Sequence, residues 1–330
     1  QTSNKGIELQ LNAYIVETKD FSLNATFNIG HNKNKIDKLA SGEKEWILTS
    51  GWNKSVMNAD DYRAYVGGTS GLIYGYVNDG FYKVEDFEYF DSKSRTWKLK
   101  EGVVDSSPLS DTPRPGNAKF KKLTPVDPNS SNPYQLTEAD RTVIGNTTPK
   151  FSGGFGLNAT YKGFDLSMFF NFMYDFDVFN ANKVMLTTWA DNHENNFGME
   201  VASDKRWRNF DDMGNEIRYS PELLAEFNKN ATMWNPTSIG KPISMSYAVE
   251  DGSFLRLNSA TLGYTLPQEW TKKAGLNKVR FYVAGSNLFT ITGYSGYDPE
   301  VDIATGLTPN IDNNRYPRSR TYTFGAQLTF

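Results

Sequence analysis

The chain has 330 residues, of which 14% are aromatic, with no cysteine and a net charge of −3. This composition is typical of a globular protein. The absence of cysteine excludes disulfides, thiolate metal sites and a cysteine nucleophile. Basic residues are dispersed among acidic ones, which argues against a nucleic-acid partner. The two histidines, His31 and His193, lack partners at the spacing of a motif such as H-E-x-x-H, so we interpret both as ordinary polar side chains.

Residues 7 to 29 alternate between apolar and polar side chains. Ile7, Leu9 and Leu11 fall on one face of an extended strand, and the alternation resumes at Phe21 after a short turn at residues 18–20. This pattern predicts a long hairpin with one apolar and one polar face. A membrane-spanning strand needs only about ten such residues, so the absence of an apolar run of about 18 residues excludes a transmembrane helix but not a membrane protein.

Two further hairpins and a final strand follow the same pattern. "GGFGLNATYKGFDLSMFFNFMYD" predicts two strands joined by a turn at Lys162-Gly163. "GSFLRLNSATLGYTLP" and "KVRFYVAGSNLFTIT" predict a third pair, in which the apolar parity changes and indicates a bulge near Asn258-Ser259. The terminal "TYTFGAQLTF" completes seven long strands. The side chains that we expect to face lipid are Leu23, Phe27, Leu157, Leu166, Met168, Phe170 and Leu328.

The connections between these strands alternate sharply in length. Short turns alternate with long loops at about residues 32–149, 176–250 and 291–317. Loops longer than about 15 residues are uncommon in compact soluble domains. Short turns at one rim and long loops at the other are typical of an outer-membrane barrel, in which the long loops are extracellular. Six of the seven tryptophans lie in the long loops, so we expect these loops to be folded against something.

Several stretches carry a family resemblance. "VEDGSFLRLNSATLGYTLPQEW", "LNKVRFYVAGSNLFTITGYSGYDPEV", "ADRTVIGNTTPKFSGGFGLNATYKGFDLSMFF" and "RSRTYTFGAQLTF" closely resemble the carboxy-terminal third of SusC/RagA-type TonB-dependent transporters of Bacteroidetes outer membranes. The resemblance implies an all-β fold, in which residues 1–330 supply about seven strands of a transmembrane antiparallel barrel of roughly 22 strands. It also implies that the plug domain and the TonB-binding segment lie in sequence outside this chain.

The same resemblance implies a function and partners. Members of the family import oligosaccharides or peptides across the bacterial outer membrane, with a SusD-like surface lipoprotein as a lid and with TonB as the source of energy. We therefore expect contacts with that lipoprotein, with the plug and the remaining barrel, and with membrane lipids, but no nucleic acid. No catalytic motif is present, so we do not expect an enzyme. The alternative is a secreted β-rich module that binds glycans through exposed aromatic residues.

Three groups of residues are candidate sites. The first is expected to contact a ligand or the lid: the loop aromatics Tyr74, Tyr76, Trp189 and Trp207, and Arg256 and Arg280 on polar strand faces, where acids of the plug are alternative partners. In the second group, Asp127, Asn129, Ser131 and Glu138 occupy positions 1, 3, 5 and 12 of a calcium-loop pattern. That pattern lacks the glycine at position 6, so a proline-rich turn is the alternative. The third group is Tyr322, Leu328 and Phe330, which the resemblance implies as a terminal aromatic signal for barrel assembly.

Overall fold

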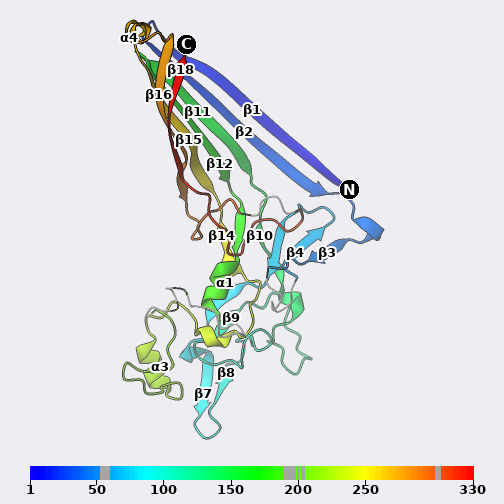
Figure 1. Ribbon diagram of the computed structural model, residues 1–330. Coiled ribbons are helices and arrows are strands. Elements are labelled where there is room, and N and C mark those ends of the chain that lie inside the picture. Colours follow the sequence, from blue (N-terminus) through cyan, green and yellow to red (C-terminus); the bar gives the residue numbers. More distant parts are fainter. Residues whose placement is uncertain (53–59, 189–197, 199–200, 202–204, 302–305) are drawn as a thin grey trace.

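The computed structural model describes residues 1–52, 60–188, 198, 201, 205–301 and 306–330 (Figure 1). A large sheet of long strands makes up one part of the molecule, and the long connections fold into a second region at one end of that sheet (Figure 1). The helix α4 (Gln268–Lys273) and the C-terminus lie at the opposite end of the sheet (Figure 1). None of the helices in the described part of the chain has the length and apolar character needed to cross a membrane.

The large sheet has seven antiparallel strands, as the alternation predicts. Their order is β1-β2-β11-β12-β15-β16-β18. The strands are β1 (Thr2–Glu17), β2 (Phe21–Ile36), β11 (Phe151–Tyr161), β12 (Phe164–Tyr174), β15 (Phe254–Thr265), β16 (Lys278–Thr292) and β18 (Thr321–Thr329). Each long strand after β1 pairs with the long strand before it in the sequence. The pairs β1–β2, β11–β12 and β15–β16 have short connections, and the other three pairs are joined by the long connections.

The predicted turn and the predicted bulge are both present. Lys162 and Gly163 have φ values of 44° and 89°, and positive φ at both central residues is the turn geometry that matches the twist of a hairpin. The pairing of β15 shifts register between Leu257 and Ser259, which brings Leu257 and Ala260 onto one face. The short helix α4 between β15 and β16 was not predicted.

One face of the large sheet is apolar across neighbouring strands. A row of directly paired residues crosses six strands: Leu11, Phe27, Phe155, Phe170, Leu257 and Phe289. Within this row the rings of Phe155 and Phe170 stack with centroids 4.5 Å apart. Many side chains of this face are exposed, among them Ile7, Leu262, Ile291 and Phe324. The face therefore presents a broad apolar surface, which in a protein requires a covering partner or a lipid environment.

The opposite face is polar. Its corresponding row reads Asn24, Asn158, Ser167, Thr261, Ala284 and Thr323. The predicted division of the side chains between two faces is therefore confirmed.

The three long connections begin and end at slightly different residues than predicted. They run from 37 to 150, from 175 to 253 and from 293 to 320, because the strands β2, β15 and β18 differ from the predicted bounds by a few residues. At the end of β2 the cause is visible in the sequence. Lys33, Lys35 and their neighbours are polar on both faces of the strand, so the alternation disappears while the pairing with β1 continues to Ile36.

These connections contain secondary structure of their own. The first holds η1 (Ala40–Gly42), β3 (Glu45–Leu48), β4 (Tyr62–Tyr65), β5 (Leu72–Gly75), β6 (Asn78–Phe81), η2 (Val84–Asp86), β7 (Phe87–Asp91), β8 (Thr96–Leu99), β9 (Ala118–Phe120), η3 (Glu138–Asp140) and β10 (Thr142–Asn146). The second holds β13 (Asp177–Asn180), α1 (Ala181–Thr187), α3 (Pro221–Phe227), η4 (Pro236–Ser238), η5 (Ser246–Ala248) and β14 (Val249–Asp251), and the third holds β17 (Ile311–Asp312).

The connections share one hydrophobic core. Residues from the first connection, such as Tyr62 and Phe120, are buried against residues of the second, such as Phe179 and Ile243, and against Ile311 of the third. Strand pairing also joins the second connection to the third, because β13 pairs with β17 in a small sheet that also contains β14. The long loops are thus folded against one another. We expected such packing because they contain six of the seven tryptophans.

Candidate functional site

Arg256 lies on the polar face of β15 and is 1% exposed. One of its Nη atoms donates to Asp298 Oδ1 at 2.5 Å and lies 3.6 Å from Glu300 Oε2. Arg318 donates to Glu300 Oε1 at 2.8 Å. Burial alone would raise the pKa of Asp298, but the hydrogen bonds from Arg256 and from the backbone N–H of Glu300 outweigh it and hold that pKa below its ordinary value. The cluster fastens the third connection to the large sheet.

Arg280 on β16 reaches across β15 to β12. Its Nε and Nη2 donate to the two carboxylate oxygens of Asp165 at 2.9 and 2.5 Å. The guanidinium passes over Gly263, where a Cβ atom would come within 2.4 Å of Arg280 Nη2. Glycine is therefore needed at this point of close approach. For both arginines the carboxylate partners come from this chain, so the alternative of partners in the plug is not needed to explain them.

The structure places the predicted loop aromatics in different environments. Tyr76 is 2% exposed and belongs to the core shared by the three connections, and Trp207 is 4% exposed and packs in a second cluster with Ile217 and Leu224. Trp207 nevertheless lines a hollow together with Arg206, Arg208 and Asn235. Contact of Tyr76 and Trp207 with a ligand or a lid stays a prediction. Tyr74 is half-buried, with the guanidinium of Arg141 4.5 Å from its ring centroid. Contact by Tyr74 stays a prediction.

The remaining predicted residues are Trp189 and the two histidines. Trp189 and His193 lie outside the described residues. His31 is on β2, and its Nδ1 is 2.6 Å from the backbone oxygen of Lys150. This contact is consistent with an ordinary polar role for His31.

The calcium-loop pattern forms an exposed turn. Asp127, Asn129, Ser131 and Glu138 are all exposed, and Asp127 Oδ1 accepts the backbone N–H of Asn129 at 2.9 Å. Within the described ranges, no group of three or more histidine, aspartate or glutamate side chains is placed to hold a metal ion. Calcium binding gains no support from this arrangement and stays a prediction.

Asp140 is the buried carboxylate of this region, and the sequence analysis did not identify it. Its side chain accepts backbone N–H groups of Leu123, Thr124 and Thr137 at 2.7 to 2.8 Å. Burial works to raise the pKa of Asp140, but the hydrogen bonds from Thr124 and from these backbone groups outweigh it and lower the pKa to about 2. Asp140 therefore closes the turn between residues 123 and 137 as an anion.

The lowered pKa of Asp140 leads to a pH-dependent stability. The carboxylate should contribute about 2 to 3 kcal/mol above pH 4, and this contribution should be lost as the pH falls from about 4 to about 2. Asp140→Asn should accordingly lower the melting temperature at pH 6, and the difference from the wild type should shrink toward pH 2. Asp127→Asn in the exposed turn is the matched control, with no such change. A difference for Asp140→Asn that does not vary with pH would contradict this assignment.

The terminal strand presents its predicted aromatic signal on the surface. Tyr322 and Leu328 lie on the apolar face of β18, where they pair with Gly285 and Val279 of β16. Phe330 follows the strand, and all three side chains are exposed. Their role in barrel assembly stays a prediction.

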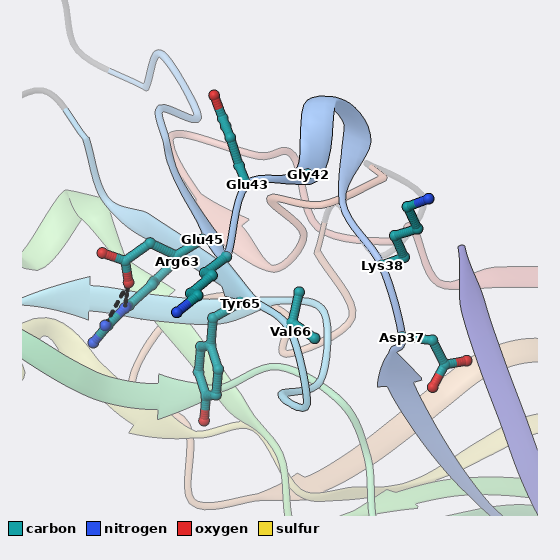
Figure 2. Close-up of a pocket in the computed structure, with 9 residues that line it drawn as sticks. Asp37, Lys38, Gly42, Glu43, Glu45, Arg63, Tyr65 and Val66 are labelled. Carbon is teal, nitrogen blue, oxygen red and sulfur yellow. Dashed lines mark hydrogen bonds and ion pairs between the residues drawn. The ribbon is translucent and has the colours of Figure 1, made fainter.

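A charged hollow lies where the first connection leaves the large sheet. Its volume is about 600 Å³, and it is lined by Asp37, Lys38, Gly42, Glu43, Lys44, Glu45, Arg63, Tyr65 and Val66. Figure 2 shows Glu45 and Arg63 pointing toward each other, and Arg63 Nε donates to Glu45 Oε2 at 3.0 Å. Acidic and basic side chains balance here, so the hollow has no strong preference for a charged ligand.

A second hollow, which we call the carboxamide pocket, lies beside α1. Its volume is about 530 Å³, and its lining includes Asn180, Asn182, Lys183, Leu186, Thr187, Ser295, Tyr297 and Asn314. These residues come from the end of β13, from α1, from the segment after β16 and from the segment after β17. No role was predicted for them, although "GYSGYDPEV" was among the stretches that carry the family resemblance.

Comparison with known proteins shows which class of protein contains a sheet of this kind. No family model matches the chain. The chain is 31% identical over 336 residues to TonB-dependent receptor P3 of Formosa agariphila, covering 100% of this chain and 29% of that protein. It is 25% identical over 338 residues to TonB-dependent receptor SusC of Bacteroides thetaiotaomicron, covering 99% of this chain and 26% of that protein.

Solved structures agree with the sequence comparisons. The chain superposes on a chain of the RagAB peptide transporter with a TM-score of 0.69 and 22% identity, covering 100% of this chain and 29% of that chain. It is therefore homologous along its whole length to one segment of SusC/RagA-type TonB-dependent receptors, as the resemblance indicated, and it spans less than a third of their length. These two curated relatives are named as receptors, and the solved structure is that of a peptide transporter.

Proposed function

We propose that the chain is part of an outer-membrane β-barrel that imports a large nutrient, an oligosaccharide or a peptide, in a TonB-dependent manner. The observation that carries this proposal is the homology over the whole chain to TonB-dependent receptors. The seven-stranded sheet with one apolar and one polar face supports it, because a barrel strand needs an apolar surface toward lipid and a polar one toward the lumen.

In this proposal the two ends of the sheet face different compartments. The short connections, including α4, lie on the periplasmic side, and the three long connections form an extracellular assembly. The exposed edges of β1 and β18 pair with further strands of the barrel, because unpaired backbone groups are costly in hydrocarbon.

The partners follow from the same homology. A SusD-like surface lipoprotein covers the extracellular assembly, and a plug domain fills the lumen and connects to TonB. The support for the lipoprotein is the likeness to a chain of a two-component transporter, RagAB. The polar face of the sheet contains glycines and the Arg280 side chain, which extends across β15. In this proposal, the plug packs against that face.

Two strains test this function: one in which the gene is deleted and one that lacks TonB. Uptake of at least one oligosaccharide or peptide should be lost in the deletion strain, and a strain without TonB should show the same defect for that nutrient. The protein should be recovered from outer membranes. Recovery from the culture medium, with nutrient uptake unchanged in the deletion strain, would instead favour the secreted glycan-binding module.

A further inference from the structure

We propose that the open end of the first hairpin binds the phosphate groups of an anionic lipid in the outer leaflet of the membrane. The site consists of Lys5, Lys33 and Lys35, which we call the lysine patch. The proposal rests on the proposed import function, because that function places the apolar face of the sheet in lipid and the long connections outside the cell. It goes beyond that function, since import by itself requires no particular lipid.

The lysine patch continues the apolar face of the sheet. The last four residue pairs of this face, in order along the hairpin, are Leu9–Ile29, Ile7–His31, Lys5–Lys33 and Ser3–Lys35. The surface therefore changes from apolar to basic at the same level on both strands. Figure 1 shows that the N-terminus, and with it this level, lies at the end of the sheet from which the first connection leaves.

The length of the apolar stretch places the patch at the membrane boundary. The outward residues of β2 are apolar from Phe21 to Ile29. At about 3.3 Å per residue and a strand tilt of about 40°, this stretch covers about 20 Å along the membrane normal. The apolar band of an outer-membrane barrel is about 25 Å tall, so Lys33 and Lys35 lie just beyond its extracellular edge.

The side chains between the apolar stretch and the patch are typical of a membrane interface. The ring centroid of His31 is 5.4 Å from that of Phe151, the first residue of the neighbouring strand β11. The other side of the imidazole is polar, because His31 Nδ1 is 2.6 Å from the backbone oxygen of Lys150. Rings with one apolar and one polar part are favoured at the level of lipid headgroups.

The positive charge in this part of the hairpin is confined to the outward face. The opposite face carries Asn4, Asn32 and Asn34, and the carboxamides of Asn32 and Asn34 donate to Asn4 Oδ1 at 3.4 and 3.1 Å. Asn34 Oδ1 also accepts the backbone N–H of Ser70 at 3.2 Å. Solubility alone would not require lysine on one face and asparagine on the other. The segregation indicates that the outward face meets a negative partner.

The charges of the patch are largely uncompensated within the chain. Lys5 and Lys33 are directly opposite each other, a placement of like charges that destabilises a strand pair. In the described part of the chain, neither ammonium group has a carboxylate within ion-pair distance. Lys35 has only a long contact, 3.9 Å from Nζ to Asp37 Oδ1. All three lysines are exposed, so a bound anion would both reach them and relieve their repulsion.

A lipid phosphate fits this arrangement better than a soluble anion does. Lysine side chains near a membrane surface lay their apolar stems along the hydrocarbon boundary and extend the ammonium group to the headgroups. Each lysine near an anionic membrane surface strengthens binding to it. A lipid that carries phosphate can pack its acyl chains on Ile7, Leu9 and Ile29 while its headgroup meets the lysine patch.

Lipid binding by the purified whole transporter tests the proposal. The protein would be stripped of lipid in a neutral detergent and titrated with lipid A that carries two phosphates, and with the same lipid A after enzymatic removal of both. We expect the phosphorylated lipid to bind more tightly. Replacing Lys5, Lys33 and Lys35 together with glutamine should raise its Kd about 30-fold, the loss expected for two uncompensated lysines at an anionic surface.

Two controls accompany this variant. A second triple variant replaces Lys93, Lys229 and Lys241 with glutamine; these exposed lysines belong to the long connections, and the change in net charge is the same. It should bind lipid A as the wild type does. The yield of barrel on an unheated gel checks folding, which the patch variant should not impair because it removes a repulsive pair.

Three results would overturn the proposal. The first is equal binding of lipid A by the wild type and by the patch variant, and the second is equal binding of the phosphorylated and dephosphorylated lipids. The third is displacement of lipid A by an equal concentration of inorganic phosphate, which would assign the patch to a soluble anion. None of these results affects the import function, which fails separately if the deletion strain keeps its uptake.

Discussion

Replacing Arg256 with methionine should lower the free energy of unfolding of the proposed barrel by about 3 to 5 kcal/mol, because the change leaves the buried Asp298 without its cation and removes one of the two cations beside Glu300. Asp298 and Glu300 are held against Arg256, which is 1% exposed. Urea titration, followed by loss of the fast-migrating band on an unheated gel, would measure the effect. The same change at Arg280, whose ion pair with Asp165 is more exposed, should cost less.

A triple variant distinguishes the charge effect from loss of packing. Arg256→Met combined with Asp298→Asn and Glu300→Gln should recover much of the stability, because it removes both carboxylate charges that faced Arg256. If the triple variant is no more stable than the single one, the cost lies in side-chain packing and the electrostatic account is wrong.

Arginine on the apolar face of the sheet should have the second large effect. Met168→Arg or Phe27→Arg should each destabilise the barrel by about 2 to 4 kcal/mol, because both positions fall near the middle of strands proposed to face lipid. The neighbouring Ser167→Arg and Thr26→Arg are matched controls on the polar face and should be tolerated. The same unfolding measurement applies, and equal losses on the two faces would contradict the proposed orientation.

The large sheet was predictable because its signal is local. Alternation with a period of two assigns each residue of a strand to a face without knowledge of the rest of the chain. Even the bulge in β15 could be located, because the apolar positions change parity between Leu257 and Ala260. The predicted strand bounds were wrong where the alternation of apolar and polar residues is lost, as at the polar end of β2.

The folded connections were not predictable in the same way. Tyr74 and Tyr76 are two residues apart, and alternation would give them similar exposure. The strand β5 ends between them, however, and Tyr76 bonds through its backbone to Ser244 and Ser246, about 170 residues away in the sequence. No short-range pattern contains that information.

The candidate sites also combine features that a local pattern predicts with features that depend on distant residues. Arg256 could be placed on a polar face, but its partner Asp298 is 42 residues further along the chain. In residues 123–140, the motif directed attention to the exposed Asp127, whereas the buried anion is Asp140, whose role depends on backbone groups on both sides of the turn. In this segment, position in a motif was therefore a poor guide to burial.

The common core of the three connections also limits how such a protein can change. Phe120, Ile243 and Ile311 belong to different connections but to one core, so a change in the volume of one side chain is felt by segments that are distant in the sequence. Exchange of a single connection between related proteins would bring mismatched parts of this core together. Recombination that preserves folding must therefore transfer the three connections as a set, whereas substitutions at their exposed surfaces leave this core intact.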